Sequence, residues 1–179
     1  FPGQFCNGFS SSPSNTPSPQ GRGAFPNVTI ADDVIAQHRL VHEHFGIQQL
    51  ELVTGWSMGA EQTYEWAVRF PEMVKRAVPF AGTAKTTPHD YLWVRAHENA
   101  IKSDPAWDGG FYEKQSDVSV GLRRHAEFWS VMGLCPDFYK QEEWRSLGFE
   151  SLDGFVEGFW EAYFAPMAPN NLIWMAWKW

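Results

Sequence analysis

The sequence is short of basic side chains and has no long apolar run. Its 179 residues carry 14 Lys and Arg against 21 Asp and Glu, a formal net charge of -7, and no basic cluster interrupts this acidic balance. We therefore expect neither nucleic acid nor an anionic membrane surface as a partner. The apolar run at residues 172–177 stops at Lys178 and is far shorter than the roughly 18 to 20 residues of a membrane span.

Cysteine is also scarce. Cys6 and Cys135 lie far apart and outside any C-x-x-C spacing, which predicts neither a disulfide framework nor a structural zinc site. This usage favours a reducing compartment, and we expect a cytoplasmic protein. The 44% of hydrophobic residues is enough for one globular core. The chain begins at Phe1 without a signal-like segment and stops at Trp179 inside an aromatic stretch, so we expect a piece of a longer protein.

Residues 1–28 are rich in Gly, Pro and Ser, which excludes a helix and predicts a long loop. A disordered tail is the alternative interpretation. The loop is nevertheless too apolar for a solvated linker, and we expect it to dock onto the rest of the protein through its phenylalanines, which are Phe1, Phe5, Phe9 and Phe25.

A helix is predicted over residues 30–45. Thr29 with Asp32 forms an acidic variant of the capping box at its start. Gly46 stands where a left-handed C-terminal cap belongs. Between them, apolar residues recur at a spacing of three to four, namely Ile30, Val34, Val41 and Phe45.

A strand, a helix and a second strand are predicted next, at residues 47–54, from Met58 to Phe70, and at 74–81. The first strand ends in a β-rich stretch, the helix shows helical periodicity and ends at Pro71, and the second strand is closed by a glycine. Together they form one right-handed crossover unit of a parallel sheet.

The rest of the chain has a different composition, because residues 83–179 hold eight of the ten Trp. Helix-like stretches lie near 90–102, 119–132, 138–147 and 151–164. We therefore predict an α/β fold in which residues 1–82 form a partial parallel sheet with flanking helices and residues 83–179 form a helical, cap-like insertion. Core packing within the missing remainder of the protein is the default role of the late tryptophans, with an acyl pocket or a partner surface as alternatives, for Trp160, Trp174, Trp177 and Trp179.

The motif Gly55-Trp56-Ser57-Met58-Gly59 is a G-x-S-x-G placed between the predicted strand and helix. A nucleophile elbow needs small residues two before and two after its serine, and Gly55 and Gly59 supply them. Such a turn presents the Ser57 hydroxyl as a nucleophile and directs the backbone N–H of Met58 at the oxygen of a bound acyl group. A glycine-flanked serine in an ordinary turn is the alternative.

With these features the sequence resembles the α/β-hydrolase superfamily, and within it the homoserine O-acetyltransferase-like proteins. The resemblance covers most of the chain. Besides the elbow, it is carried by residues 8–15 (G-F-S-S-S-P-S-N), 25–29 (F-P-N-V-T), Asp33, Gln37, 45–47 (F-G-I), Trp66-Ala67, Phe70-Pro71, 100–112 (A-I-K-S-D-P-A-W-D-G-G-F-Y) and Gly121-Leu122.

The resemblance implies a Ser-Asp-His triad, an acyl-serine intermediate, a small-molecule acyl donor and acceptor, and no metal or organic cofactor. Only Ser57 maps onto this chain. The triad Asp and His would follow Trp179, and the second oxyanion donor would precede Phe1, so we expect the 179 residues alone to be inactive. Unpaired sheet edges and uncovered aromatic surface further predict self-association, with a homodimer as one form.

Departures from the acetyltransferase pattern indicate a substrate other than homoserine. Where such enzymes resemble G-G-S-L-G-G-M-Q, this chain has Trp56 and then Ala60-Glu61-Gln62. Glu98 falls where those enzymes carry an arginine that holds the substrate's carboxylate, and a Glu there would repel it. The expected reaction is acyl transfer from an ester or thioester to water or an alcohol. A non-catalytic small-ligand-binding protein on the same fold is the second hypothesis.

Two further sets of residues are candidates for binding a ligand. Trp56 and His89 are candidates for contacting the substrate, because His89 follows the second strand at the sheet edge where this fold opens its pocket; a surface or capping role is the alternative. His38, His42 and His44 offer a pair at helical spacing, but no Cys or carboxylate completes a metal shell, and no metal is expected.

Overall fold

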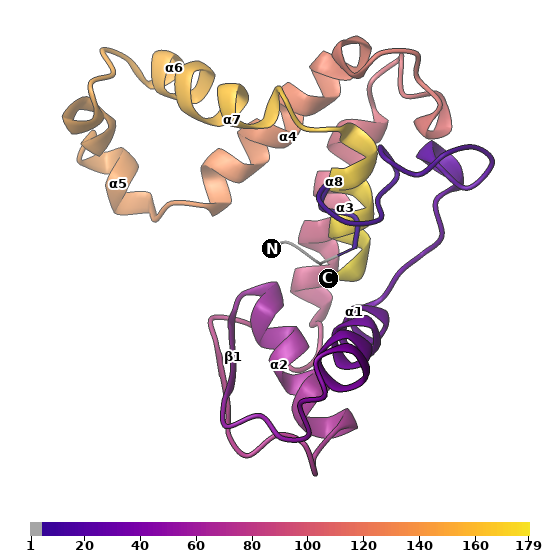
Figure 1. Cartoon of the computed structure of the whole chain (residues 1–179). Coiled ribbons are helices and arrows are strands. Elements are labelled where there is room, and N and C mark those ends of the chain that lie inside the picture. Colours follow the sequence, from indigo (N-terminus) through magenta and orange to yellow (C-terminus); the bar gives the residue numbers. More distant parts are fainter. Residues whose placement is uncertain (1–4) are drawn as a thin grey trace.

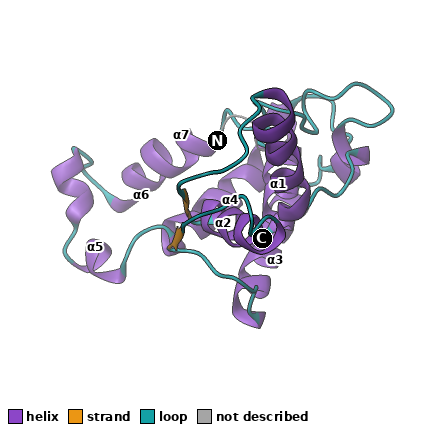
Figure 2. Cartoon of the chain, turned by 60° about the horizontal axis from the view of Figure 1, so that its bottom comes forward, coloured by secondary structure: helices purple, strands orange, loops and turns teal. Residues whose placement is uncertain are grey.

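The computed structural model describes residues 5–179, so the predicted contact of Phe1 lies outside the described residues. Helices dominate, and within these residues strand is confined to one short parallel pair (Figure 1, Figure 2). The α-helices and strands are α1 (Ile30–His38), β1 (Val53–Trp56), α2 (Met58–Arg69), β2 (Ala77–Phe80), α3 (Pro88–Lys102), α4 (Ser119–Met132), α5 (Pro136–Lys140), α6 (Leu152–Phe155), α7 (Ala162–Phe164) and α8 (Pro169–Lys178). Short 3-10 helices are η1 (Arg22–Ala24), η3 (Asp108–Gly110), η4 (Gln115–Val118) and η5 (Glu143–Leu147), and π-helical segments are η2 (Arg39–His44) and η6 (Val156–Glu161).

The predicted helix at 30–45 is confirmed as α1 continued by η2. The Thr29 hydroxyl accepts from the N–H of Asp32 at 3.2 Å, and the Asp32 carboxylate accepts from the N–H of Thr29 at 2.8 Å, so the capping box is complete. Gly46 has φ +69°, the left-handed conformation expected of a C-terminal cap.

The strand-helix-strand unit is confirmed as β1, α2 and β2. The two strands are parallel, from the pair Val53 and Ala77 to the pair Trp56 and Phe80. Helix α2 packs on both strands and α1 packs on α2. The ladder is shorter than the predicted strands at 47–54 and 74–81, because only an isolated bridge between Leu50 and Val74 pairs their first halves.

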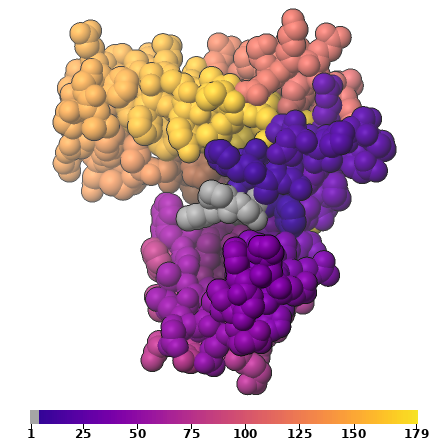
Figure 3. Space-filling view, viewed as in Figure 1, coloured from indigo at the N-terminus to yellow at the C-terminus, as the bar shows by residue number. Residues whose placement is uncertain are grey.

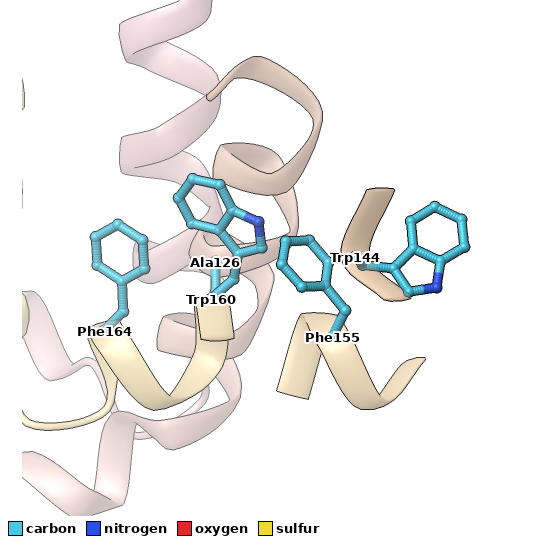
Figure 4. Packing of buried hydrophobic residues seen from close by; sticks show 5 residues of the cluster. All are labelled: Ala126, Trp144, Phe155, Trp160 and Phe164. Carbon is cyan, nitrogen blue, oxygen red and sulfur yellow. The ribbon is translucent and has the colours of Figure 1, made fainter. Parts of the chain in front are cut away.

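The predicted helices at 90–102 and 119–132 are confirmed as α3 and α4, and the stretch at 151–164 is built from α6, η6 and α7. The predicted helix at 138–147 is wrong as one element, because Glu142, in the left-handed conformation with φ 52°, separates α5 from η5. The sequence analysis does not predict helix α8. Figure 1 shows α3 and α8 running side by side between the sheet part and the remaining helices, and α3 also packs on α4. The outer helices share an aromatic cluster, drawn in Figure 4, whose buried members are Ala126, Trp144, Phe155, Trp160 and Phe164. Trp160 is thus a core residue, but its core is formed by this chain and not, as the default interpretation expects, by the remainder of the protein.

The N-terminal loop docks onto the helical part rather than onto the sheet. In Figure 3 its indigo surface lies against the yellow surface of α8. Asn171 accepts from the N–H of Ser14 at 3.1 Å, and Trp174 donates to the carbonyl of Phe25 at 2.9 Å. Phe25 is buried, but Phe9 is 84% exposed, so the expectation that Phe9 anchors the loop is wrong. The domain boundary after residue 82 stays a prediction.

A buried ion pair joins the end of α8 to α1. The ammonium of Lys178 lies 2.7 and 2.9 Å from the two carboxylate oxygens of Asp33 and donates to the carbonyl of Phe5 at 2.8 Å, with both charged side chains fully buried. Gln62 of α2 also donates to Asp33 at 3.1 Å. The pair therefore fixes α8 against α1, and Gln62 links Asp33 to α2, the helix that follows Ser57. No helix within residues 5–179 is long and apolar enough to cross a bilayer.

Candidate active site

Ser57 occupies the single-residue bend between β1 and α2. Its backbone has φ 57° and ψ -125°, a conformation that costs a non-glycine residue about 1–3 kcal/mol and is found mainly at functional sites. The bend is held from both sides, because the Ser57 N–H donates to the carbonyl of Phe80 at 3.2 Å and the Ser57 carbonyl accepts from Ala60 at 2.8 Å. The tight turn that the G-x-S-x-G motif predicts is therefore present.

Glycines are required on only one side of the motif. A Cβ added at Gly55 would lie 2.0 Å from the carbonyl oxygen of Gly59, whereas one added at Gly59 would meet no atom within 4 Å. The expectation that Gly59 must be small is wrong, because its Cα hydrogen points into open space. The second close approach is made by Gly82, after β2, where a Cβ would lie 2.5 Å from the carbonyl oxygen of Ser57.

The Ser57 residue lines a cavity of about 430 Å³ between α2, the loop after β2 and α3. Two of its walls carry carboxyl groups, Glu61 and Asp90, and an apolar wall is formed by Trp93, Val94 and Trp179. The remaining lining residues are Ala81, Gly82, Thr83 and Thr86. This lining has no basic side chain and no histidine among the residues that the structure describes.

Glu61 and Asp90 differ in their electrostatic state. Burial, with a smaller contribution from the charge of Asp90, raises the pKa of Glu61 to about 7, and its Oε2 atom is buried without a hydrogen-bond partner in residues 5–179. Asp90 closes the capping box of α3, and hydrogen bonds from the Thr87 side chain and backbone hold its pKa below the usual value. Sequence reasoning noted Glu61 only as a departure from a pattern; its spacing of four residues from Ser57 on one helix is the signal that places it in the cavity.

The other predicted site residues are placed as follows. Met58 is the first residue of α2 and is buried, and its role as oxyanion donor stays a prediction. Trp56 is 61% exposed and the His89 side chain is 81% exposed, and neither belongs to the cavity lining. Their contact with a substrate stays a prediction.

Glu98 lines a different cavity, of about 180 Å³, together with Trp107, Trp174 and Trp177. There it pairs with Lys102 at 2.5 Å. Glu98 is thus absent from the lining of the Ser57 cavity, and its expected repulsion of a substrate carboxylate stays a prediction.

The remaining histidines have other partners. His97 of α3 and His125 of α4 are buried with their Nδ1 atoms 3.1 Å apart, and Trp129 donates to Nε2 of His125 at 3.0 Å. His125 must then carry its proton on Nδ1 and donate to His97. Burial lowers the pKa of both rings. Neither ring lines the Ser57 cavity.

The histidines of α1 and η2 stack on neighbouring rings. His38 stacks on Phe70, with ring centroids 3.9 Å apart, and on His42 at 5.2 Å. Within the described part of the chain, no three His, Cys, Asp or Glu side chains are grouped so that they could hold a metal ion.

Comparisons with known proteins agree with this geometry. A family model for the alpha/beta hydrolase fold matches residues 6–128. The chain is 53% identical over 176 residues to an ethyl acetate hydrolase from Pseudomonas veronii, covering 98% of this chain and 50% of that protein. It is 42% identical over 145 residues to a homoserine O-acetyltransferase from Methanococcoides burtonii, covering 78% of this chain and 30% of that protein.

A crystal structure of an acetylester hydrolase from Corynebacterium glutamicum superposes with a TM-score of 0.93 at 48% identity, over 98% of this chain and 51% of that one. The chain thus spans about half the length of the relatives that it matches. The family match covers most of the chain, and the strand-turn-helix around Ser57 has the geometry of a nucleophile elbow. The chain belongs to the α/β-hydrolase fold family.

Proposed function

We propose that the protein containing this chain is a serine-dependent ester hydrolase or acyltransferase in which Ser57 becomes acylated. The observation that carries the proposal is the backbone of Ser57, held at φ 57° between a strand and a helix and lining the 430 Å³ cavity. A strained serine at such a position is typical of a nucleophile.

The reaction would proceed in two steps. The Oγ atom of Ser57 attacks the carbonyl carbon of an ester while a histidine takes its proton, and the proton then passes to the departing alcohol. In the second step, water or a second alcohol gives a proton to the histidine and attacks the carbonyl carbon of acyl-Ser57. The Ser57 oxygen leaves and takes this proton from the histidine, and the acid or the new ester is released. The N–H of Met58 is proposed to donate to the oxyanion. No histidine among residues 5–179 lines the cavity, which supports a base and its orienting Asp from beyond Trp179.

The substrate class follows from the relatives and from the cavity. One relative is named an ethyl acetate hydrolase and a solved relative an acetylester hydrolase, so we propose short acyl esters, with acetyl esters first. Water is proposed as the acceptor, because both of these relatives are named hydrolases. A cytoplasmic location is proposed as well, because Cys6 and Cys135 are both free thiols. Burial raises the pKa of the Cys6 thiol to about 11.

A fluorophosphonate probe tests the nucleophile in the full-length protein. We expect the probe to label Ser57, a Ser57→Ala variant to lose the label, and a Ser146→Ala variant to keep it, because Ser146 lies on η5 away from the cavity. A folded protein that is not labelled at Ser57 would favour the alternative, a small-ligand-binding protein on the hydrolase fold.

A further inference from the structure

We propose that Glu61, together with Asp90, restricts the Ser57 cavity to esters without a negative charge and rejects esters that carry a carboxylate a few bonds from the scissile bond. This inference rests on the proposed function and deepens it, because it assigns a substrate class and a specificity-determining residue to the same cavity.

The two carboxyl groups enter the cavity from different helices. Glu61 stands one helical turn after Ser57 on α2, so its side chain lies on the same helix face as the bend. Asp90 comes from the first turn of α3. Both line the cavity with Ser57, and the lining itself has no Lys, Arg or His among the described residues. Outside the lining, Nδ1 of the exposed His89 lies 3.8 Å from Oδ1 of Asp90, so Glu61 is the carboxyl group without a basic neighbour there. A substrate that reaches Ser57 must therefore lie beside acidic groups.

The side chains of the lining also offer few free hydrogen-bond donors to a substrate carboxylate. The hydroxyl of Thr83 donates to the carbonyl of Lys85 and that of Thr86 donates to the carbonyl of Trp179, both at 2.7 Å. The indole N–H of Trp93 is buried and has no partner within residues 5–179, but it is a neutral donor and suits an ester oxygen better than a full charge.

Desolvation decides the preference. A carboxylate that leaves water needs a cation or several donors in exchange, and here it would meet like charge instead. A neutral alkyl group would meet Trp93, Val94 and Trp179, which form the apolar wall. The cavity should therefore accept an alkyl ester and reject its carboxylate analogue of the same shape.

Two acetyl esters of matched shape test this inference in the full-length enzyme. The first is 3-methylbutyl acetate. The second is 3-acetoxypropanoate, in which a carboxylate of similar shape replaces the terminal isopropyl group. We expect the parent enzyme to favour the neutral ester in kcat/KM. The assay is run above pH 8, where Glu61 is ionised although burial raises its pKa to about 7. Glu61→Gln then removes the charge at nearly constant size, and we expect it to reduce this preference by about ten-fold or more, through faster turnover of the anionic ester.

The control is Glu65→Gln, one turn further along α2. Glu65 pairs with Arg69 at 2.6 Å and does not line the cavity, so its loss should leave the preference unchanged. Glu61→Met provides a second neutral variant of similar length. The fluorophosphonate label on Ser57 is measured in every variant.

The outcomes separate the two proposals. If Ser57 is labelled and the neutral ester is hydrolysed, but the preference is the same in the parent, Glu61→Gln and Glu61→Met, the assignment of Glu61 is refuted and the proposed function stands. If the parent protein turns over both esters equally, the inference is also refuted. If Ser57 is not labelled, the proposed function fails and this inference fails with it.

Discussion

At the scale of single residues, the strained backbone of Ser57 is the feature on which its proposed role as nucleophile rests. Its positive φ persists because β2 accepts its N–H and the first turn of α2 binds its carbonyl. The G-x-S-x-G pattern predicts this bend from sequence. It does not predict that Gly82 takes the place of Gly59 as the second close contact, because that depends on how closely the end of β2 approaches the elbow.

Gly55→Ala and Gly59→Ala form a matched pair that tests the elbow. The Gly55 variant must displace the Gly59 carbonyl, and we expect it to lower the free energy of unfolding by about 1–3 kcal/mol and to reduce esterase activity strongly. The Gly59 variant gains helix propensity in open space and should keep its stability and activity. Urea denaturation and ester turnover measure both effects; equal losses in the two variants would contradict the packing seen here.

At the scale of elements, the helices are predictable and the strands less so. Thr29 and Gly46 mark the ends of the α1 and η2 helix locally, so its bounds follow from the sequence. The strands at 47–54 and 74–81 are predicted over their full length, but the ladder runs only from Val53 and Ala77 to Trp56 and Phe80. Leu50 and Val74 keep the same register in an isolated bridge, so local sequence gives the pairing but not the length over which the ladder continues. The buried pair of His97 and His125 is likewise invisible, since 28 residues separate the two rings.

This histidine pair predicts a loss of stability in acid. Burial lowers the pKa of both rings in the folded state, whereas the unfolded chain titrates near the usual value of about 6.5. The unfolded state therefore binds more protons as the pH falls below about 6.5, and the stability present above that pH is lost towards the folded pKa of His97, about 4. We expect the Tm to fall across this window.

A double variant, His97→Leu with His125→Leu, should flatten the fall of the Tm between those pH values. The control is His89→Leu, because the His89 side chain is 81% exposed and should not contribute. Thermal unfolding followed by circular dichroism measures the slope. A slope in the double variant as steep as in the parent would show that the pair does not couple α3 and α4 to pH.

At the scale of the whole molecule, the ion pair of Lys178 and Asp33 connects residues 145 positions apart and ties α8 to α1. Removing one partner of such a buried pair typically costs about 3–5 kcal/mol, because the other charge is left uncompensated. The sequence shows Asp33 as a feature of the family but gives no sign of its partner. Trp179 follows Lys178 in the chain and lines the Ser57 cavity, so the ion pair also helps to position this wall of the cavity.

The small sheet also leaves apolar surface uncovered. Trp56, Val78 and Phe80 of the two strands are each at least half exposed. Such a surface is unusual for a stable monomer and is where the predicted self-association of the 179 residues would take place.

The central claim is that Ser57 carries the acyl group during turnover. The most direct measurement is to quench the full-length enzyme in acid while it hydrolyses an acetyl ester and to map the acetylated peptide by mass spectrometry. We expect one acetyl group on the peptide that contains residues 55–59, and none in a Ser57→Ala variant. Steady turnover by that variant, or acetyl at another residue instead of Ser57, would contradict the account.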